Sequence, residues 1–355
     1  MSDPHRWRLS WIVLSLLCAG CSGSAGTVPL PEPSGSPAPP IALGRGTLAV
    51  ISHKGPHEFV LIFPPNSDQS THQIPIHDEH GQHLKGNSLA FDRRGHLYIG
   101  MHDTSQGGKY YILEVDIHNW VVVRDIVVSG WAFSSVATDN ENYLYVNTKA
   151  AIGGDIDIFR DNRETKPYIE IKDHHNPVST FVSRDALWVG YSGLFSRVLA
   201  RYRLRSTERT LFEPISTGRV DAMTVNPEGS LVAVLTKDAS RPTVNVFDVN
   251  SKRLRKLLEA AQLSAMTSDE SGNVFIGEYR DREWTIAATD FGGNSFGRIT
   301  SSGQPAQALA VSPLDGTLYV ASRNASDVRV YNSRNGKFLK DLPVGFNPSA
   351  LAFEP

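Results

Sequence analysis

The chain has 355 residues, of which 40% are hydrophobic and 20% charged, and its formal net charge at pH 7 is −2. A chain of this length can bury a large core, and its nearly neutral charge leads us to expect no nucleic-acid partner. The cysteines are Cys18 and Cys21. We therefore expect the region after them to contain no disulfide, no thiol nucleophile and no cysteine-based metal centre.

Residues 1–21 have the features of an export signal. Arg6 and Arg8 precede an apolar stretch, residues 11–20, that is too short to span a bilayer. The stretch leads into Leu-Cys-Ala-Gly-Cys, where Cys21 follows two small residues. This ending resembles a bacterial lipobox, which implies that the Cys21 thiol receives a lipid anchor. Because Cys18 stands where a lipobox usually has leucine, cleavage by an ordinary signal peptidase is one alternative, and a retained, uncleaved anchor is another.

Residues 22–42 are rich in proline, serine, glycine and alanine. Such a segment cannot bury enough apolar surface to offset the entropy of ordering it, so we expect a disordered tether. Together with the lipid anchor, the tether predicts an exported protein held on a membrane, facing the periplasm or the cell surface.

From residue 43 onward the sequence repeats with a period of about 44 residues. Each repeat contains an apolar strand between turn residues, most copies have a small-residue strand before it, and two further strands follow. Four strands in a repeat are typical of a β-propeller blade. The aligned apolar residues are Leu48, Leu97, Leu144, Leu187, Leu231, Val274 and Leu318.

The two ends of this region complement each other. It begins at "GTLAVIS", a second strand without a first, and ends at "PSALAFEP", a first strand without a second. We expect residues 350–353 to pair with residues 48–51, because this pairing removes a free sheet edge. The prediction is therefore an all-β, seven-bladed propeller over residues 43–355, with six blades between residues 87 and 347 and one shared between the two ends.

The last full repeat begins "GTLYVASRNASDVRVYNSRNGKF". With its Leu-Tyr-Val strand, Val-x-Val-Tyr strand and Asn-Gly turn, it resembles the YVTN-type β-propeller repeat, and "LYVNT" at residues 144–148 is similar to it. NHL-type repeats are a close neighbour of this pattern. The resemblance implies a seven-bladed propeller in a family whose members are mostly exported or surface-associated, and it implies no single activity.

In a propeller, the connections from one blade to the next and the loops between second and third strands lie on the same face of the ring. Ligands of propellers usually bind on that face. Asp221, Arg219 and Glu278 on this face are candidates for catalysis, because neighbouring carboxylates can do acid–base work. A local ion pair between Asp221 and Arg219 is the alternative. His53 is expected on the same face. The candidate ligand-binding residues are Asn87, Trp131, His174, His175, Arg219, Asp221 and Asn347.

A histidine-rich insertion precedes the repeat that begins at residue 87. His77, His80 and His83 lie in it, and His102 lies in a neighbouring loop. Imidazoles with a carboxylate such as Asp78 suit a divalent transition metal, so the insertion is a candidate metal site. The alternative is a solvated polar loop that binds no metal.

Three functions remain open. The first is a membrane-tethered monomer that binds an unknown protein or small-molecule ligand or acts as a scaffold, and the lack of an assembled catalytic constellation favours it. The second is a lactonase- or esterase-like hydrolase with its site at the channel mouth. A calcium-dependent lactonase is disfavoured because Asp221 is the single carboxylate among the positions where the inner strands begin. The third is metal capture by the insertion from His77 to His83.

Overall fold

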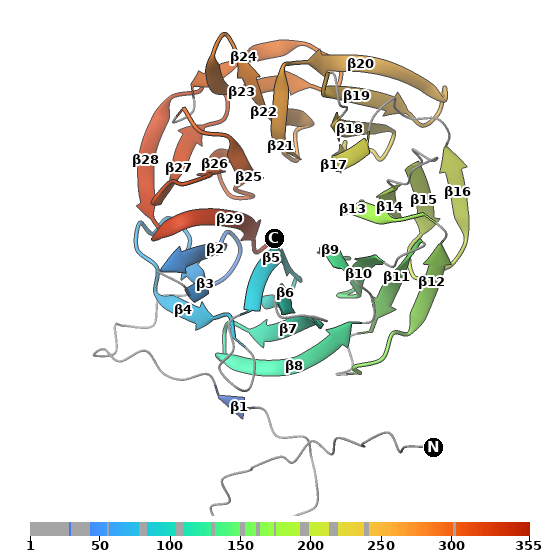
Figure 1. Ribbon diagram of the computed structural model, residues 1–355, viewed down its shortest axis with the longest axis vertical. Coiled ribbons are helices and arrows are strands. Elements are labelled where there is room, and N and C mark those ends of the chain that lie inside the picture. Colours follow the sequence, from blue (N-terminus) through green and yellow to red (C-terminus); the bar gives the residue numbers. More distant parts are fainter. Residues whose placement is uncertain are drawn as a thin grey trace, which may run out of the picture.

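Seven antiparallel sheets stand around a common axis in the computed structural model (Figure 1). This arrangement confirms the all-β, seven-bladed propeller. In the described part of the chain every regular element is a strand. No helix there is long and apolar enough to cross a membrane. The structure describes residues 28–29, 43–54, 57–77, 84–103, 109–128, 132–149, 153–160, 164–173, 175–191, 199–212, 219–237, 241–300 and 303–355.

The first three blades follow in chain order, each with its innermost strand first. Blade 1 comprises β5 (Leu84–Phe91), β6 (His96–Asp103), β7 (Tyr110–Asp116) and β8 (Val121–Val128). Blade 2 comprises β9 (Ala132–Thr138), β10 (Leu144–Lys149), β11 (Gly154–Phe159) and β12 (Ile169–Asp173). Blade 3 comprises β13 (Pro177–Val182), β14 (Ala186–Tyr191), β15 (Leu199–Arg203) and β16 (Arg209–Phe212). The short β1 (Val28–Pro29), within the expected tether, pairs with β8 at the outer edge of blade 1.

The next three blades repeat this order. Blade 4 comprises β17 (Arg219–Val225), β18 (Leu231–Lys237), β19 (Thr243–Asp248) and β20 (Arg253–Glu259). Blade 5 comprises β21 (Gln262–Ser268), β22 (Asn273–Arg280), β23 (Glu283–Asp290) and β24 (Ser295–Thr300). Blade 6 comprises β25 (Ala306–Val311), β26 (Thr317–Ser322), β27 (Asp327–Asn332) and β28 (Phe338–Pro343).

The seventh sheet, here called the closing blade, joins strands from both ends of the repeat region. Its innermost strand is β29 (Phe346–Phe353), followed by β2 (Leu48–Lys54), β3 (His57–Phe63) and β4 (His72–Pro75). The register places Leu48 opposite Phe353 and Ile51 opposite Ala350. The predicted pairing of residues 350–353 with residues 48–51 is therefore confirmed.

Apolar side chains fill all seven seams between neighbouring blades. Successive residues of a strand point to opposite faces of its sheet, so each blade contributes to the two seams beside it. In β2, for example, Ala49 and Ile51 pack against blade 1, whereas Leu48 and Val50 pack against blade 6. Burial on both faces explains why the second strands of the repeats are apolar along nearly their whole length.

Small polar residues connect the innermost strands around the axis. The hydroxyls of Ser135 in β9 and Thr180 in β13 are 2.7 Å apart and share a hydrogen bond. The amide of Val136 donates to Ser88 Oγ in β5 at 3.1 Å. Blades are closest together at the axis, so residues of this size fit there and join one blade to the next.

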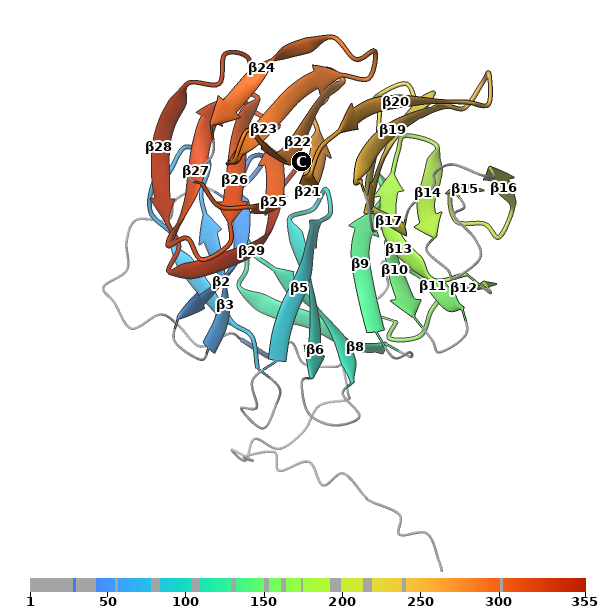
Figure 2. The ribbon, with the colours of Figure 1, turned by 45° about the horizontal axis from the view of Figure 1, so that its top comes forward.

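The two ends of the ring carry different connections. Strands within a blade are antiparallel, so the connections between blades and those between second and third strands emerge at one end, here called the mouth face (Figure 2). The first-to-second and third-to-fourth turns lie at the opposite end. Most of the residues predicted to bind ligands therefore belong to one end of the ring.

The pairing between each inner strand and the second strand of its blade shifts register near the mouth face. A bulge of this kind leaves a residue outside the ladder and redirects its side chain. The sequence placed the beginnings of the inner strands at Asn87, Ser134, Ser179, Asp221, Ser264, Gln307 and Ser349, and all of these except Ser179 lie in the bulges. The residues within the shifts are Asn87, Ser134, Val178, Asp221, Ser264 and Ala265, Gln307, and residues 347–349.

Asp157 in β11 is a buried carboxylate, with 3% of its surface exposed. It lies two residues from Phe159 and so points into the seam between blades 1 and 2. Glu170 is directly opposite on β12, and Asp157 Oδ1 has no hydrogen-bond partner among the described residues. Burial, and then the charges of Glu170 and Asp155, raise the pKa of Asp157 to about 7.

We expect Asp157→Asn to stabilise the protein at pH 8 by about 2–4 kcal/mol. The folded state holds this proton up to about pH 7, whereas the unfolded chain releases it near 3.8, so stability falls as pH rises between these values. The gain should therefore shrink toward pH 4. Urea unfolding at both pH values measures it, with Asp185→Asn, which changes an exposed aspartate in blade 3, as the control. Equal stability of Asp157→Asn and the parent at pH 8 would contradict the prediction.

Candidate functional site

Asp221 occupies the bulge of β17 and makes an ion pair across the strand ladder. Lys237 Nζ at the end of β18 lies 2.6 Å from Asp221 Oδ2, and the two side chains are 44% and 26% exposed, respectively. The observed partner of Asp221 is thus Lys237. Arg219, the partner considered from the sequence, lies in β17, but its side chain is outside the described part of the structure. The pair places a partly exposed carboxylate and an ammonium group side by side on the mouth face.

Glu278, in β22, lies in the seam between blades 4 and 5 and is fully buried. It lies two residues beyond Ile276, which packs in the cluster that contains Leu235 of blade 4. Its Oε1 accepts a hydrogen bond from Arg298 Nε at 2.9 Å. Glu278, which the sequence suggested as a second carboxylate beside Asp221 on the mouth face, is therefore buried instead of lining that face. Its carboxylate is enclosed between strands and already paired with a guanidinium group.

His53 and Glu58 form a second polar pair at the mouth face, in the closing blade. They face each other across β2 and β3, with His53 Nδ1 3.5 Å from Glu58 Oε1. Glu58 is 6% exposed, whereas the His53 side chain is 23% exposed. The sequence predicted His53 on this face but did not single out Glu58, because nothing in one sequence reports which residues lie opposite each other.

The other predicted ligand-binding residues lie apart around the ring. Asn347, in the bulge of β29, has a φ of 53° and accepts a hydrogen bond from the Asn324 amide at 3.2 Å. Asn87 is exposed in the bulge of β5. His175 precedes β13, its ring 5.8 Å from that of Tyr191. Trp131 and His174 lie outside the described residues.

The described residues leave the predicted metal site untested. His77 is exposed just after β4, whereas His80 and His83 are outside the described ranges. His102 in β6 stacks on Tyr110, with the ring centroids 6.0 Å apart. No group of three histidine, cysteine, aspartate or glutamate side chains within the described ranges could hold a metal ion. Metal capture by the histidine-rich insertion stays a prediction.

Several buried polar atoms near the mouth face have no hydrogen-bond partner among the described residues. They belong to first or second strands near this end, or to a connection between blades. Buried polar atoms are nearly always satisfied, so each of these calls for a polar partner such as an ordered water or a ligand. Unpartnered buried atoms also occur elsewhere in the ring, among them Asp157 Oδ1 and Glu354 Oε2. The atoms near the mouth face are His102 Nδ1, Asn147 Oδ1, Asn176 Oδ1, Ser264 Oγ, Ser322 Oγ and Ser349 Oγ, while Glu278 Oε2 is unpartnered inside the seam between blades 4 and 5.

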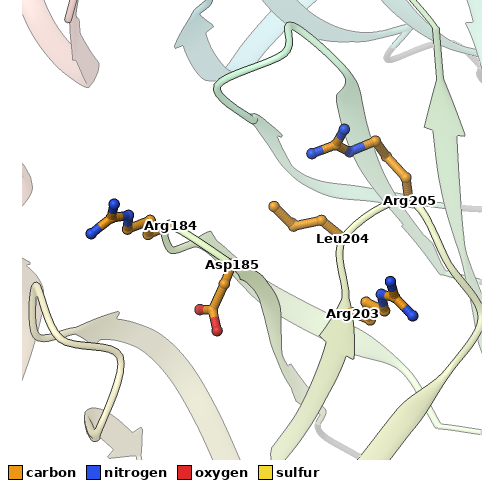
Figure 3. A pocket seen from close by; sticks show the side chains of 5 residues that line it. All are labelled: Arg184, Asp185, Arg203, Leu204 and Arg205. Atoms are coloured by element: carbon orange, nitrogen blue, oxygen red, sulfur yellow. The ribbon is translucent and has the colours of Figure 1, made fainter.

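A hollow of about 330 Å³ lies at the other end of the ring, on blade 3. Figure 3 shows the guanidinium groups of its lining arginines pointing apart around Leu204. Arg205 is paired with Asp139 and Glu141, and Asp185 is 2.7 Å from Arg201. Because most of these charges are neutralised by neighbours, the hollow lacks the convergent polar groups of a ligand site.

No protein-family model and no curated protein matches this sequence. Solved structures match its fold. They include the Pseudomonas aeruginosa periplasmic gluconolactonase PpgL (TM-score 0.59, 16% identity, 86% of this chain and 98% of that one). A Bacteroides uniformis protein named as a candidate 6-phosphogluconolactonase has a TM-score of 0.62 at 12% identity, over 87% of this chain and 100% of that one. Kuenenia stuttgartiensis hydrazine synthase has a TM-score of 0.61 at 15% identity, and the match covers 76% of this chain and 90% of that one. At these identities the matches establish the propeller fold and nothing finer.

Proposed function

We propose that the protein binds a small polyhydroxylated lactone at the mouth face and hydrolyses its ring ester. The observation that carries this proposal is the group of unpartnered buried polar atoms at that end of the ring. Hydroxyl groups can both donate and accept hydrogen bonds, so a polyhydroxylated ligand suits a mixed set of imidazole, amide and hydroxyl atoms. The gluconolactonase names of two structural neighbours support the lactone as the substrate class.

The Asp221–Lys237 pair is the substrate-binding element in this proposal. Its carboxylate accepts hydrogen bonds from ligand hydroxyls, and its ammonium group donates to ring or carbonyl oxygens. Hydrolysis adds water across the acyl–oxygen bond, giving one carboxylic acid and one hydroxyl group. No carboxylate cage is required for this reaction, in agreement with Asp221 being the one carboxylate among the described bulge residues.

We also propose that this activity is located outside the cytoplasm. The charged and apolar pattern of residues 1–20, the lipobox-like ending at Cys21 and the proline-rich composition of residues 22–42 support an export signal, a lipid anchor and a tether, and with them a membrane-anchored monomer. Apart from Val28 and Pro29, these segments lie outside the described residues.

We expect the purified domain to hydrolyse at least one aldonolactone faster than the spontaneous rate, measured by a pH-indicator assay over a panel of lactones and simple esters. Asp221→Asn should raise KM about tenfold, because one hydrogen-bonding carboxylate is worth about 1–2 kcal/mol. The control is Asp185→Asn, which changes an ion-paired aspartate at the opposite end of the ring and should leave KM unchanged.

Binding titrations on the same panel separate the two main candidate functions. A lactone that binds but is not hydrolysed would identify a ligand-binding module, which the same polar atoms also support. The absence of both binding and hydrolysis across the panel would contradict the proposal.

A further inference from the structure

We propose that the outer edge of β8 is the docking surface for the chain's own tether, which adds to blade 1 as a fifth strand and holds the rim of the ring next to the membrane anchor. β1 pairs antiparallel with the beginning of β8, with Val28 opposite Val122 and the next residue opposite Val121. Blade 1 is the one five-stranded sheet in the described part of the chain, and β1 lies outside β8 at its rim (Figure 1). The docking is independent of the proposed lactone hydrolysis, whereas its effect at the membrane rests on the proposed lipid anchor at Cys21.

The register of this pairing suits a proline. Residue pairs in an antiparallel ladder alternate between those that exchange two backbone hydrogen bonds and those that exchange none. Pro29 has no N–H to donate, so it can only occupy a pair of the second kind, and Val28 then occupies a pair of the first kind. The Val28 amide is therefore the donor from the tether to the Val122 carbonyl, and the Val122 amide donates to the tether in return.

β8 is an apolar strand at the edge of a sheet, where another strand can pair. Six of its eight residues are valine or isoleucine, and the Val127 side chain is 60% exposed. The outermost strand of blade 4, β20, instead exposes the charged residues Arg253, Arg255 and Lys256. Charges of this kind oppose edge pairing, whereas an apolar edge is open to it. β1 covers the beginning of the apolar edge, so the tether docks where the strand composition favours an added strand.

The chain returns to the ring beside the place where it docks. Leu43, at the start of the propeller region, packs on the same apolar cluster as Trp120, the residue before β8. In the same turn, His118 Nε2 lies 3.3 Å from Glu354 Oε1, and the Glu354 carbonyl accepts a hydrogen bond from the Gly46 amide at 2.8 Å. Docking therefore closes a short loop between β1 and Leu43 whose two ends belong to the same part of the ring. The entropic cost of closing a short loop is small.

Docking shortens the part of the tether that is left to span the distance to the membrane. Cys21 is seven residues from Val28, and an extended chain covers at most about 3.6 Å per residue, which gives a reach of about 25 Å. Without docking, the chain would be free as far as Leu43, and the reach would be about 80 Å. The docked tether therefore keeps the rim of blade 1 closest to the bilayer. The mouth face then opens to the side, where a soluble ligand can enter.

Cysteine pairs test the docking in the full chain, purified in detergent with Cys18 and Cys21 changed to serine. The chain has no other cysteine, so introduced pairs report on the tether alone. Val28→Cys with Val122→Cys should form a disulfide in air, because the Cα atoms of such a pair lie about 5.5 Å apart, within disulfide range. Val28→Cys with Val127→Cys should form one at least tenfold more slowly, because position 127 lies about 17 Å further along β8.

A second control places the partner cysteine on the neighbouring blade. Gln73 is exposed in β4, the outermost strand of the closing blade, which adjoins blade 1. A tether that is not docked would reach both blades, so Val28→Cys would react with Gln73→Cys as readily as with the cysteines on β8. Equal rates of disulfide formation with positions 73, 122 and 127 would overturn the docking.

Hydrogen exchange tests the docking in the full chain without introduced cysteines. The Val122 amide should exchange about tenfold more slowly in the parent than in Val28→Pro, because this substitution removes the donor that fixes the pair. Val28→Ala is the matched control, since it keeps the backbone amide and should keep most of the protection. A Val122 amide that exchanges equally fast in the parent and in folded Val28→Pro would contradict the docking.

The orientation is tested separately, with the lipidated protein on vesicles that carry a headgroup dye. Energy transfer from a dye on Val127→Cys, at the rim of blade 1, should exceed transfer from a dye on Leu254→Cys in blade 4, and Val28→Pro should remove the difference. Equal transfer from both positions in the parent overturns the orientation and leaves the docking standing. A chain that carries no lipid overturns the proposed anchor and the orientation with it, and the disulfide rates still decide the docking. None of these outcomes depends on lactone hydrolysis.

Discussion

Removing residues 346–355 is expected to abolish the folded ring. These residues form β29, which completes the closing blade and pairs with β2. Without them, the inner edge of β2 loses its backbone partners, and the apolar groups of Val50 and Ile51, both fully buried, become accessible to water. We expect a loss of at least about 5 kcal/mol, comparable to the whole stability of many domains. Urea unfolding monitored by tryptophan fluorescence, with gel filtration to detect aggregation, measures it.

The controls for this truncation use the same strand. Deleting only the exposed Pro355 should leave the unfolding midpoint unchanged. A synthetic peptide of residues 346–355, added in excess to the truncated chain, should restore a cooperative transition, because a strand that binds only the folded form stabilises it by mass action. If the truncated protein unfolds at the same urea concentration as the parent, β29 does not hold the ring together.

Arg124→Met is expected to destabilise the protein by about 3–5 kcal/mol, the cost of leaving a buried charge without its partner. Arg124 in β8 donates to Glu114 in β7, and both residues are buried. It also donates to the carbonyls of Arg160 and Glu164 in blade 2, at 3.1 and 2.6 Å. The substitution therefore breaks an ion pair within blade 1 and two hydrogen bonds between blades. Urea unfolding at pH 7 measures the loss.

The Glu114 carboxylate should also make the stability of the folded protein depend on pH. Burial acts to raise the pKa of Glu114, but hydrogen bonding to His96 and the charge of Arg124 outweigh it and hold this pKa below its ordinary value of 4.5. The stability that the group contributes is therefore present above that value and is lost as pH falls below it. In Arg124→Met this loss on acidification should be smaller.

Two controls separate a buried pair from a surface one. Arg203→Met removes an arginine that is 76% exposed and 3.7 Å from Glu208, and it should change stability by less than about 1 kcal/mol. Combining Arg124→Met with Glu114→Gln should be less damaging than Arg124→Met alone, because no buried charge is then left over. If the double variant loses as much stability as the Arg124→Met and Glu114→Gln losses added together, the two residues do not form a coupled pair.

The architecture could be predicted because it depends on local patterns that repeat. Strands with two buried faces give apolar runs such as residues 48–51, and the turns between them give Gly, Asn and Asp at regular intervals. The half-repeats at the two ends then specified the partner of β2, and the structure pairs Ile51 with Ala350 as expected. Asp221 was placed correctly at the entry of its inner strand, where the structure shows a bulge.

The side-chain partners could not be predicted, because they depend on contacts between residues distant in sequence. Asp221 pairs with Lys237 on the neighbouring strand, and Glu58 binds the Gly86 amide in another blade. Glu278 was expected on the ligand-binding face, but β22 continues to Arg280 and places it inside a seam. One signal was available, since strand alternation puts Glu278 on the same face as Ile276.

The bulges of the inner strands separate the chemistry of the mouth face from the stability of the ring. A bulged residue such as Asn87, Asp221 or Gln307 lies between ladder pairs rather than within them. Its side chain can therefore be exchanged while the pairs on either side stay joined. Seven such positions give one scaffold many combinations of charge and size at a single face, so new ligand preferences can arise by point substitution without redesign of the framework.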